Sequence, residues 1–113
     1  MDRLEQYRQY IQKILTEWEQ KGSMFPDVEA EAIFDRERDR YQLVRVGWKN
    51  EENTRVYGCL LHVDIKNGKI WVQHDGGEEA IADRLVELGV PKQDIVVAYH
   101  PPSLRQYTAF AVG

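Results

Sequence analysis

The sequence has one cysteine, Cys59, among its 113 residues, so an internal disulfide is excluded. No apolar run approaches the ~20 residues of a membrane-spanning helix. The N-terminal stretch MDRLEQYRQY also lacks the apolar core of a secretory signal. These absences predict a cytoplasmic protein with no membrane association, and the length suits one domain over residues 1–113.

The chain also lacks an excess of positive charge. It has 15 Lys and Arg residues against 19 Asp and Glu residues, which gives a formal net charge of −4 at pH 7. Nucleic-acid affinity depends largely on neutralising phosphates, so this balance disfavours direct DNA contact unless a partner supplies it. The composition, 42% hydrophobic and 30% charged, is that of a folded globular protein.

Motifs for catalysis and cofactor binding are missing as well. The sequence has no Walker loop, no dinucleotide fingerprint and no paired Cys/His spacing of the zinc type. Glu29 and Glu31 share a strand face and resemble paired acid–base carboxylates, but a solvated face pairing with Arg45 is favoured. The sequence therefore predicts a non-enzymatic protein without catalytic residues, metal or cofactor.

A hairpin over residues 55–75 organises the rest of the chain. Asn67-Gly68 is the strongest short signal for a two-residue turn, because both turn residues need positive φ. Strict alternation outward from this turn pairs Leu61 with His74. It predicts a buried face made of Tyr57, Cys59, Leu61, Val63, Ile65, Ile70, Val72 and His74. The opposite face is then a mixture of polar and apolar side chains.

The other elements follow from periodicity and stop signals. A helix is predicted over residues 2–21, with Asp2 and Glu5 forming a capping box and Gly22 ending it. Strands at 28–35 and 40–48 precede the hairpin, and a helix at 78–88 and a strand at 95–99 follow it. Short connections predict an antiparallel arrangement. The predicted fold is two-layer α+β: an N-terminal helix, a four-stranded antiparallel meander, a second helix and a short closing strand. Residues 109–112 either add an edge strand or pack against the body.

Two interpretations apply to the turn at His74, Asp75 and Gly76. Backbone N–H groups of a glycine pair before a helix can bind an anion. Alternatively, this is a tight turn in which Asp75 caps the helix and His74 packs at the core margin. A ligand-binding or enzymatic centre would join His74, Asp75 and Gly76 to the segment that carries His100, Pro101 and Arg105. His62 and His74 are predicted on opposite faces, so they cannot share a metal ion without a bulge.

The mixed face of the sheet is the candidate protein interface. Contiguous apolar patches on a surface often mark protein–protein contact, although scattered surface hydrophobic residues are the alternative. The side chains expected to gather on this face are Ile33, Leu43, Leu60 and Trp71. Either this face or the His100-Pro101-Pro102 end would bind a partner protein or a second copy of the chain in a homo-oligomer.

Five stretches run in order through nearly all of residues 2–112: RLEQYRQYIQKIL, FDRERDRYQLVRVGW, RVYGCLLHVDIKNGKIWVQHDG, LVELGVPKQDIVVAYHPP and RQYTAFAV. Together they resemble the XisI family, the fdxN element excision controlling factor proteins of filamentous cyanobacteria. Gly77-Glu78 departs from the threonine-glutamate expected there. The resemblance implies an accessory role in programmed DNA excision during heterocyst development, beside a separate recombinase and with an XisH-type protein as partner. It supplies no catalytic residues.

Overall fold

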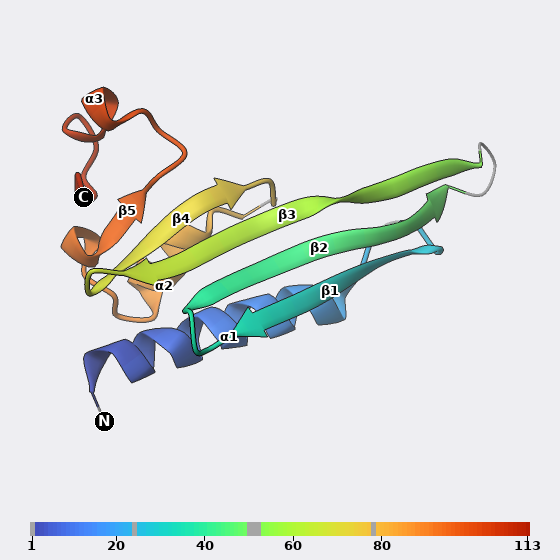
Figure 1. Ribbon diagram of the computed structural model, residues 1–113, viewed down its shortest axis with the longest axis horizontal. Coiled ribbons are helices and arrows are strands. Elements are labelled where there is room, and N and C mark those ends of the chain that lie inside the picture. The colour runs from blue at the N-terminus through green and yellow to red at the C-terminus, as the bar shows by residue number, and fades with distance from the viewer. Residues whose placement is uncertain (1, 24, 50–52, 78) are drawn as a thin grey trace.

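The computed structural model describes residues 2–23, 25–49, 53–77 and 79–113. The elements are, in order, α1 (Arg3–Lys21), β1 (Val28–Asp35), β2 (Arg40–Lys49), β3 (Thr54–Lys66), β4 (Lys69–Asp75), α2 (Ile81–Glu87), η2 (Lys92–Asp94), β5 (Ile95–Val97) and α3 (Pro102–Arg105). The strands form one sheet in the order β1-β2-β3-β4-β5, antiparallel throughout except for the parallel pair β4–β5 (Figure 1). The predicted α+β fold, with its meander and closing strand, is confirmed.

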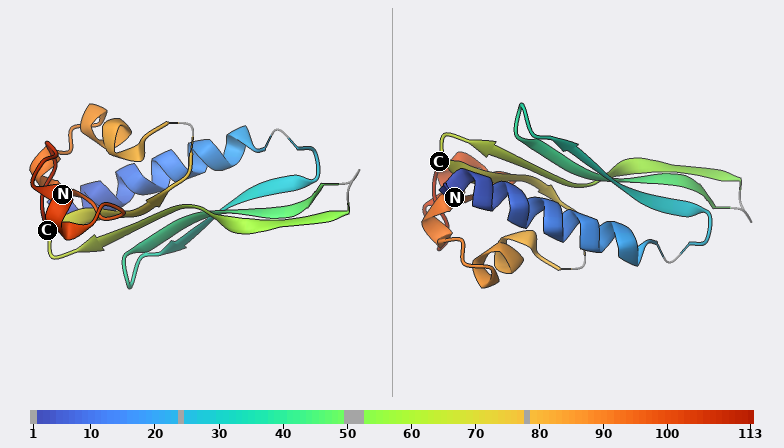
Figure 2. Two further views of the ribbon diagram at one scale, coloured as in Figure 1. Left: turned by 90° about the horizontal axis from the view of Figure 1, so that it is seen from above. Right: turned by 90° about the horizontal axis from the view of Figure 1, so that it is seen from below.

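Both longer helices lie on the same side of the sheet (Figure 2). We call this side the inner face and the opposite side the outer face. The core lies between the inner face and the helices. Its fully buried members include Ile11, Ile14, Leu15, Tyr41, Leu43, Leu61, Ile70, Ile81, Leu85 and Ile95. Burying each such side chain contributes roughly 1.5–3 kcal/mol as an upper estimate. Among the described helices, none is long and apolar enough to cross a membrane.

Helix α1 begins and ends where the sequence signals predicted. The Asp2 carboxylate accepts the backbone N–H of Glu5 at 2.9 Å, which satisfies one of the free N–H groups of the first turn. Gly22 follows the helix with φ +69°, a conformation that glycine adopts without steric cost. The apolar stripe of Tyr7, Ile11, Ile14 and Leu15 faces the core, so this helix is held mainly by tertiary packing.

The β3–β4 hairpin keeps its predicted register only near the turn. Asn67 and Gly68 have φ values of 54° and 76°, as a two-residue turn requires. Ile65 pairs with Ile70, and the next inner pair agrees as well. A shift between His62 and Val63 then leaves Gln73 as an extra residue, so that His62 pairs with His74 and Leu61 with Asp75. The predicted pairing of Leu61 with His74 is wrong because of this bulge.

A second bulge lies between β2 and β3. Leu43 pairs with Leu61 but Val44 pairs with Cys59, so Leu60 is the extra residue on β3. An extra residue reverses which side chains face the core. Tyr57 and Cys59 are therefore exposed on the outer face, and the prediction that both are buried is wrong. Beyond the bulge, β2 and β3 continue past the end of α1 as a projecting arm (Figure 1).

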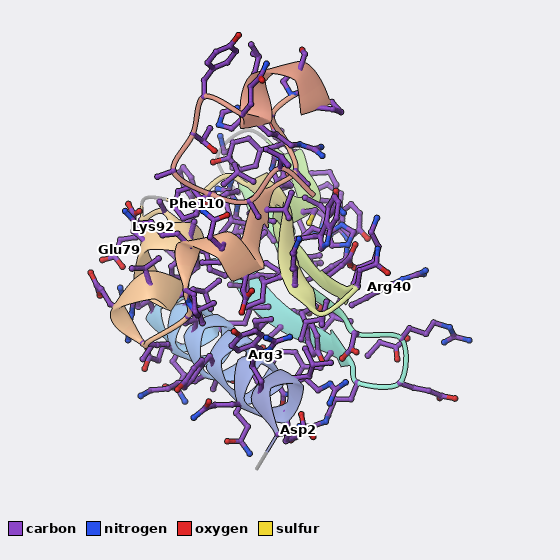
Figure 3. The ribbon with its side chains drawn as sticks, turned by 90° about the vertical axis from the view of Figure 1, so that its left-hand side faces the viewer. Asp2, Arg3, Arg40, Glu79, Lys92 and Phe110 are labelled. Carbon is purple, nitrogen blue, oxygen red and sulfur yellow. The ribbon has the colours of Figure 1, made fainter. Side chains whose placement is uncertain are left out.

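The C-terminal tail packs at the β5 edge of the sheet. Ala111 forms an isolated parallel bridge with Val96, and its N–H donates to the Ile95 carbonyl at 2.9 Å. The Lys92 ammonium lies 6.0 Å from the centre of the Phe110 ring, and the two labelled residues lie together in Figure 3. The sequence left open whether the tail adds an edge strand or packs against the body. The tail packs against the body and adds only a single bridge beside β5.

An ion pair joins α1 to the β1–β2 turn. Two Arg8 nitrogens, Nε and Nη2, donate to the two carboxylate oxygens of Asp39 at 2.7 and 3.1 Å, and the Tyr41 hydroxyl donates to Asp39 at 3.0 Å. These hydrogen bonds, from Arg8 first and then Tyr41, hold the pKa of Asp39 below its usual value. Asp39 also has φ 56°, which asparagine tolerates well.

Asp39→Asn should therefore lower the free energy of unfolding at pH 7 by about 2 kcal/mol, the usual range for a hydrogen bond to a charged group. A carboxyl whose folded pKa is depressed stabilises the fold above its unfolded pKa of about 4 and loses that effect as pH falls through the folded value. Urea unfolding should thus show a smaller difference in unfolding free energy between the wild type and Asp39→Asn at pH 3 than at pH 7. Glu37→Gln, in the same turn, is the control. If Asp39→Asn lowers the unfolding free energy equally at both pH values, the stabilising role assigned to the ionised Asp39 carboxylate is contradicted.

Candidate functional site

The turn after β4 uses its polar groups internally. One Asp75 carboxylate oxygen accepts the N–H of Gly77 at 3.3 Å, and the other accepts the N–H of Ile81, the first residue of α2, at 3.0 Å. Gly76 donates its N–H to the Leu60 carbonyl at 2.8 Å. The N–H groups of the glycine pair are thus occupied within the chain, and Asp75 bonds the first N–H of α2, as the tight-turn interpretation expects. Helix α2 begins three residues later than predicted, at Ile81, and Glu78 lies outside the described residues.

His74 is exposed on the outer face, not at the core margin as predicted. It pairs with His62, whose Nε2 lies 2.9 Å from Asp64. The other Asp64 oxygen accepts the side-chain N–H of Gln73 at 3.2 Å. The predicted separation of the two histidines is wrong because of the Gln73 bulge. Even so, the described residues contain no group of three His, Cys, Asp or Glu side chains that could hold a metal ion.

His100 and Pro101 lie between β5 and α3, and Arg105 is the last residue of α3. Arg105 donates from Nε to the His100 carbonyl at 3.0 Å and from Nη2 to the Ala98 carbonyl at 3.1 Å. Pro101 is the N-cap residue of α3. Arg105 therefore anchors the tail to the sheet. Within the described residues, no hydrogen bond or ion pair joins this segment to the His74–Gly76 turn. Tyr99, the residue before His100, does have an electrostatic link to the turn. Burial first, and then the negative charge of Asp75, raise the pKa of Tyr99.

A pair of substitutions tests the structural role of the turn. Asp75→Ala should destabilise the fold by about 1 kcal/mol, the usual cost of removing a helix cap. His74→Ala should leave the unfolding midpoint unchanged, because its side chain is exposed. Thermal unfolding followed by circular dichroism distinguishes the two. Equal midpoints for Asp75→Ala and the wild type would show that the cap contributes nothing.

Two of the four residues predicted to form the protein interface lie on the inner face of the sheet, not on the outer face. Leu43 is fully buried, and Leu60 is half-buried against the core. Trp71 is half-buried: its indole N–H donates to the Lys66 carbonyl at 3.0 Å, and the Arg105 guanidinium lies 5.6 Å from its ring. Ile33 is exposed, as an interface residue must be. Leu43 is therefore excluded as a surface contact, and Leu60 lies on the inner face.

The outer face of β1–β3 has a different set of exposed apolar side chains. Tyr57 is 72% exposed, Trp48 49% and Ile33 47%. The sheet register places Val46 beside Tyr57 and Val44 beside Cys59. In the described part of the chain, no helix covers this side of β1–β3 (Figure 2). The three side chains and Cys59 form what we call the outer patch.

Sequence reasoning missed Tyr57 and Trp48. Tyr57 was assigned to the core because alternation was counted through the Leu60 bulge. For Trp48, the structure decides the side: Tyr41 and Leu43 at odd positions of β2 are buried, which places the even positions on the outer face. The Arg55 guanidinium lies 5.1 Å from the Trp48 ring, so a cation borders the patch.

Comparisons with known proteins give one consistent result. The XisI protein family matches residues 1–112. The crystal structure of a XisI-like protein from Anabaena variabilis ATCC 29413 is 40% identical, with a TM-score of 0.90 over 98% of this chain and 100% of its own. That of the fdxN element excision controlling factor XisI from the same organism is 36% identical, with a TM-score of 0.83 over 99% and 100%. No curated protein matches the chain significantly.

Proposed function

Because the chain belongs to the XisI family, we propose that it is a non-enzymatic accessory factor that acts by binding an XisH-type protein. The solved relative named as an fdxN element excision controlling factor supports a role in controlling DNA excision. In this proposal the whole chain acts as one cytoplasmic domain, and the recombination chemistry belongs to another protein.

The outer patch is the observation that carries the proposal. Exposed tyrosine and tryptophan side chains with a flanking arginine have the composition of binding hot spots. Tyr57 is 72% exposed, so its ring adds little to the free fold but has a large area to bury against a partner. An interface of this kind also explains how an acidic chain can take part in a DNA transaction without contacting phosphate itself.

The edge of the sheet is a less suitable contact than its face. β1 is an edge strand, and a partner strand could in principle add to it. The Glu19 carboxylate of α1, however, accepts the Ala32 N–H of β1 at 2.5 Å. This bond occupies a backbone donor in the middle of the edge, so the proposal assigns binding to the face.

Light scattering on size-exclusion peaks tests the proposal. The chain, of 13.3 kDa, is run alone, with its genomic XisH-type neighbour, and after co-expression with it. The proposal expects a mixed peak whose mass is a sum of the two subunits. Separate peaks in every sample would overturn it. Self-association of the chain alone that is lost on adding the neighbour would show that a second copy uses the same face.

A further inference from the structure

A pocket lies on the inner face, beyond the C-terminal end of α1 and opposite the outer patch. It has a volume of about 300 Å³ and opens between the helix end, the sheet and the β4–α2 turn. Its main lining side chains are Trp18, Lys21, Phe25, Leu43, Arg45 and Leu60. Ligand pockets for small molecules begin at about this volume. No residue of the outer patch lines it, so the pocket is independent of the proposed function.

One part of the pocket is apolar. Leu43 and Leu60 come from adjacent strands and pack against the core, as does Trp18. The Trp18 ring lies 3.4 Å from the position that a Cβ at Gly77 would take, so the indole packs against the turn. These side chains provide an apolar surface suited to a flat or aliphatic ligand body.

The other part carries two cations. Arg45 pairs with Ala30 on β1 and Gly58 on β3, so it faces inward and not toward Glu29 and Glu31 as the sequence suggested. Its neighbours are small, which leaves the guanidinium exposed. Lys21 is exposed too. Neither cation has a hydrogen bond or ion pair with any other residue that the structure describes.

One carboxylate balances part of this charge. Glu79 also lines the pocket and lies at the surface beside α2 (Figure 3). Among the lining residues that the structure describes, two cations against one anion leave a net positive charge of one, which suits a single negative charge. A polyanion such as a nucleic-acid strand would meet repulsion from Glu79.

We propose that this pocket binds a small carboxylate with an apolar body, of the aryl or alkyl monocarboxylate class. Arg45 would donate two N–H groups to the carboxylate oxygens in the two-pronged geometry that guanidinium groups favour, and Lys21 would add a second positive charge. The apolar body would cover Trp18 and Leu60, which are half-buried, and exclude water from them.

The probe for this site is indole-3-acetate, compared with its neutral analogue indole-3-acetamide and the cationic analogue tryptamine. Each is titrated into the full-length ¹⁵N-labelled chain while NMR shifts are followed at the Trp18 indole N–H and the Gly58 and Gly77 amides. The acid should give saturable shifts at these positions, and the amide should bind at least ~10-fold more weakly because it loses the charged hydrogen bonds. Equal affinities for the three probes, or no shifts at these positions with the acid, would overturn the proposal.

Matched variants locate the charge. Arg45→Gln should weaken indole-3-acetate at least ~10-fold and leave indole-3-acetamide unchanged. Lys13→Gln removes the same charge from the exposed side of α1, away from the lining residues, and should change neither. Unchanged acid binding in Arg45→Gln, or an equal loss of acid binding in Lys13→Gln, would contradict the site.

Discussion

Tyr57→Ser is expected to weaken binding of the XisH-type protein by about 30-fold, which corresponds to the roughly 2 kcal/mol of a hot-spot residue. The Tyr57 ring is 72% exposed in the free chain, so the substitution removes little packing from the fold. Its loss should appear in the dissociation constant measured by titration calorimetry, while the unfolding midpoint stays within a degree or two of the wild type.

Tyr107→Ser is the matched control for this prediction. Tyr107 is 79% exposed and lies after α3, away from the outer patch. Loss of a tyrosine there should leave the affinity unchanged. If Tyr57→Ser and Tyr107→Ser bind equally well, the outer patch is not the interface. If both weaken binding alike, the contact extends to the tail and the assignment to the face of β1–β3 fails.

Gly47→Ala is expected to be the most damaging single methyl addition in the sheet. A Cβ at this position would stand 2.0 Å from the Asp27 carbonyl oxygen and 2.6 Å from the Val28 Cα. Both are backbone atoms, and the same carbonyl accepts the Trp48 N–H at 3.0 Å. Relief of the overlap requires β1 to move away from β2, at a cost of about 3 kcal/mol. For a domain of this size the melting temperature should fall by roughly 10 °C.

Gly58→Ala provides a control in the neighbouring strand. A Cβ there meets nothing within 4 Å, and removing a glycine from a strand interior tends to stabilise it. Its melting temperature should equal or exceed that of the wild type. A Gly47→Ala variant as stable as Gly58→Ala would mean that β1 does not start against Gly47 as described.

The sequence predicted those features that depend on short, local signals. The Asp2 cap, the glycine after α1 and the Asn67-Gly68 turn each act within a few residues, and all three are confirmed. The capping role of Asp75 was one of two interpretations, and the structure selects it through the N–H of Ile81.

The sequence did not predict the sides on which long strands place their residues. Leu60 and Leu61 are both apolar, so either alternation fits at that point, and nothing marks Leu60 as the extra residue. Gln73 is likewise unmarked. Each bulge reverses the faces beyond it, which moved Tyr57 and Cys59 outward and brought His62 opposite His74. The residues of the candidate interface therefore differ more from the sequence prediction than the fold does.

The pocket was also beyond sequence reasoning. Arg45 lies opposite Gly58, and Trp18 lies against Gly77. These residues are far apart in the chain, and only the packing of α1 against the sheet and the turn brings them together. Their types show no spacing that would single them out.

Cys59 offers the most direct test of the account, because it is the chain's only cysteine and lies exposed within the outer patch. Its alkylation rate with iodoacetamide is followed by mass spectrometry, for the chain alone and with saturating XisH-type protein. We predict ready labelling of the free chain and a several-fold slower rate in the complex. An unchanged rate, in a sample that light scattering shows to be the complex, would contradict binding through the outer face.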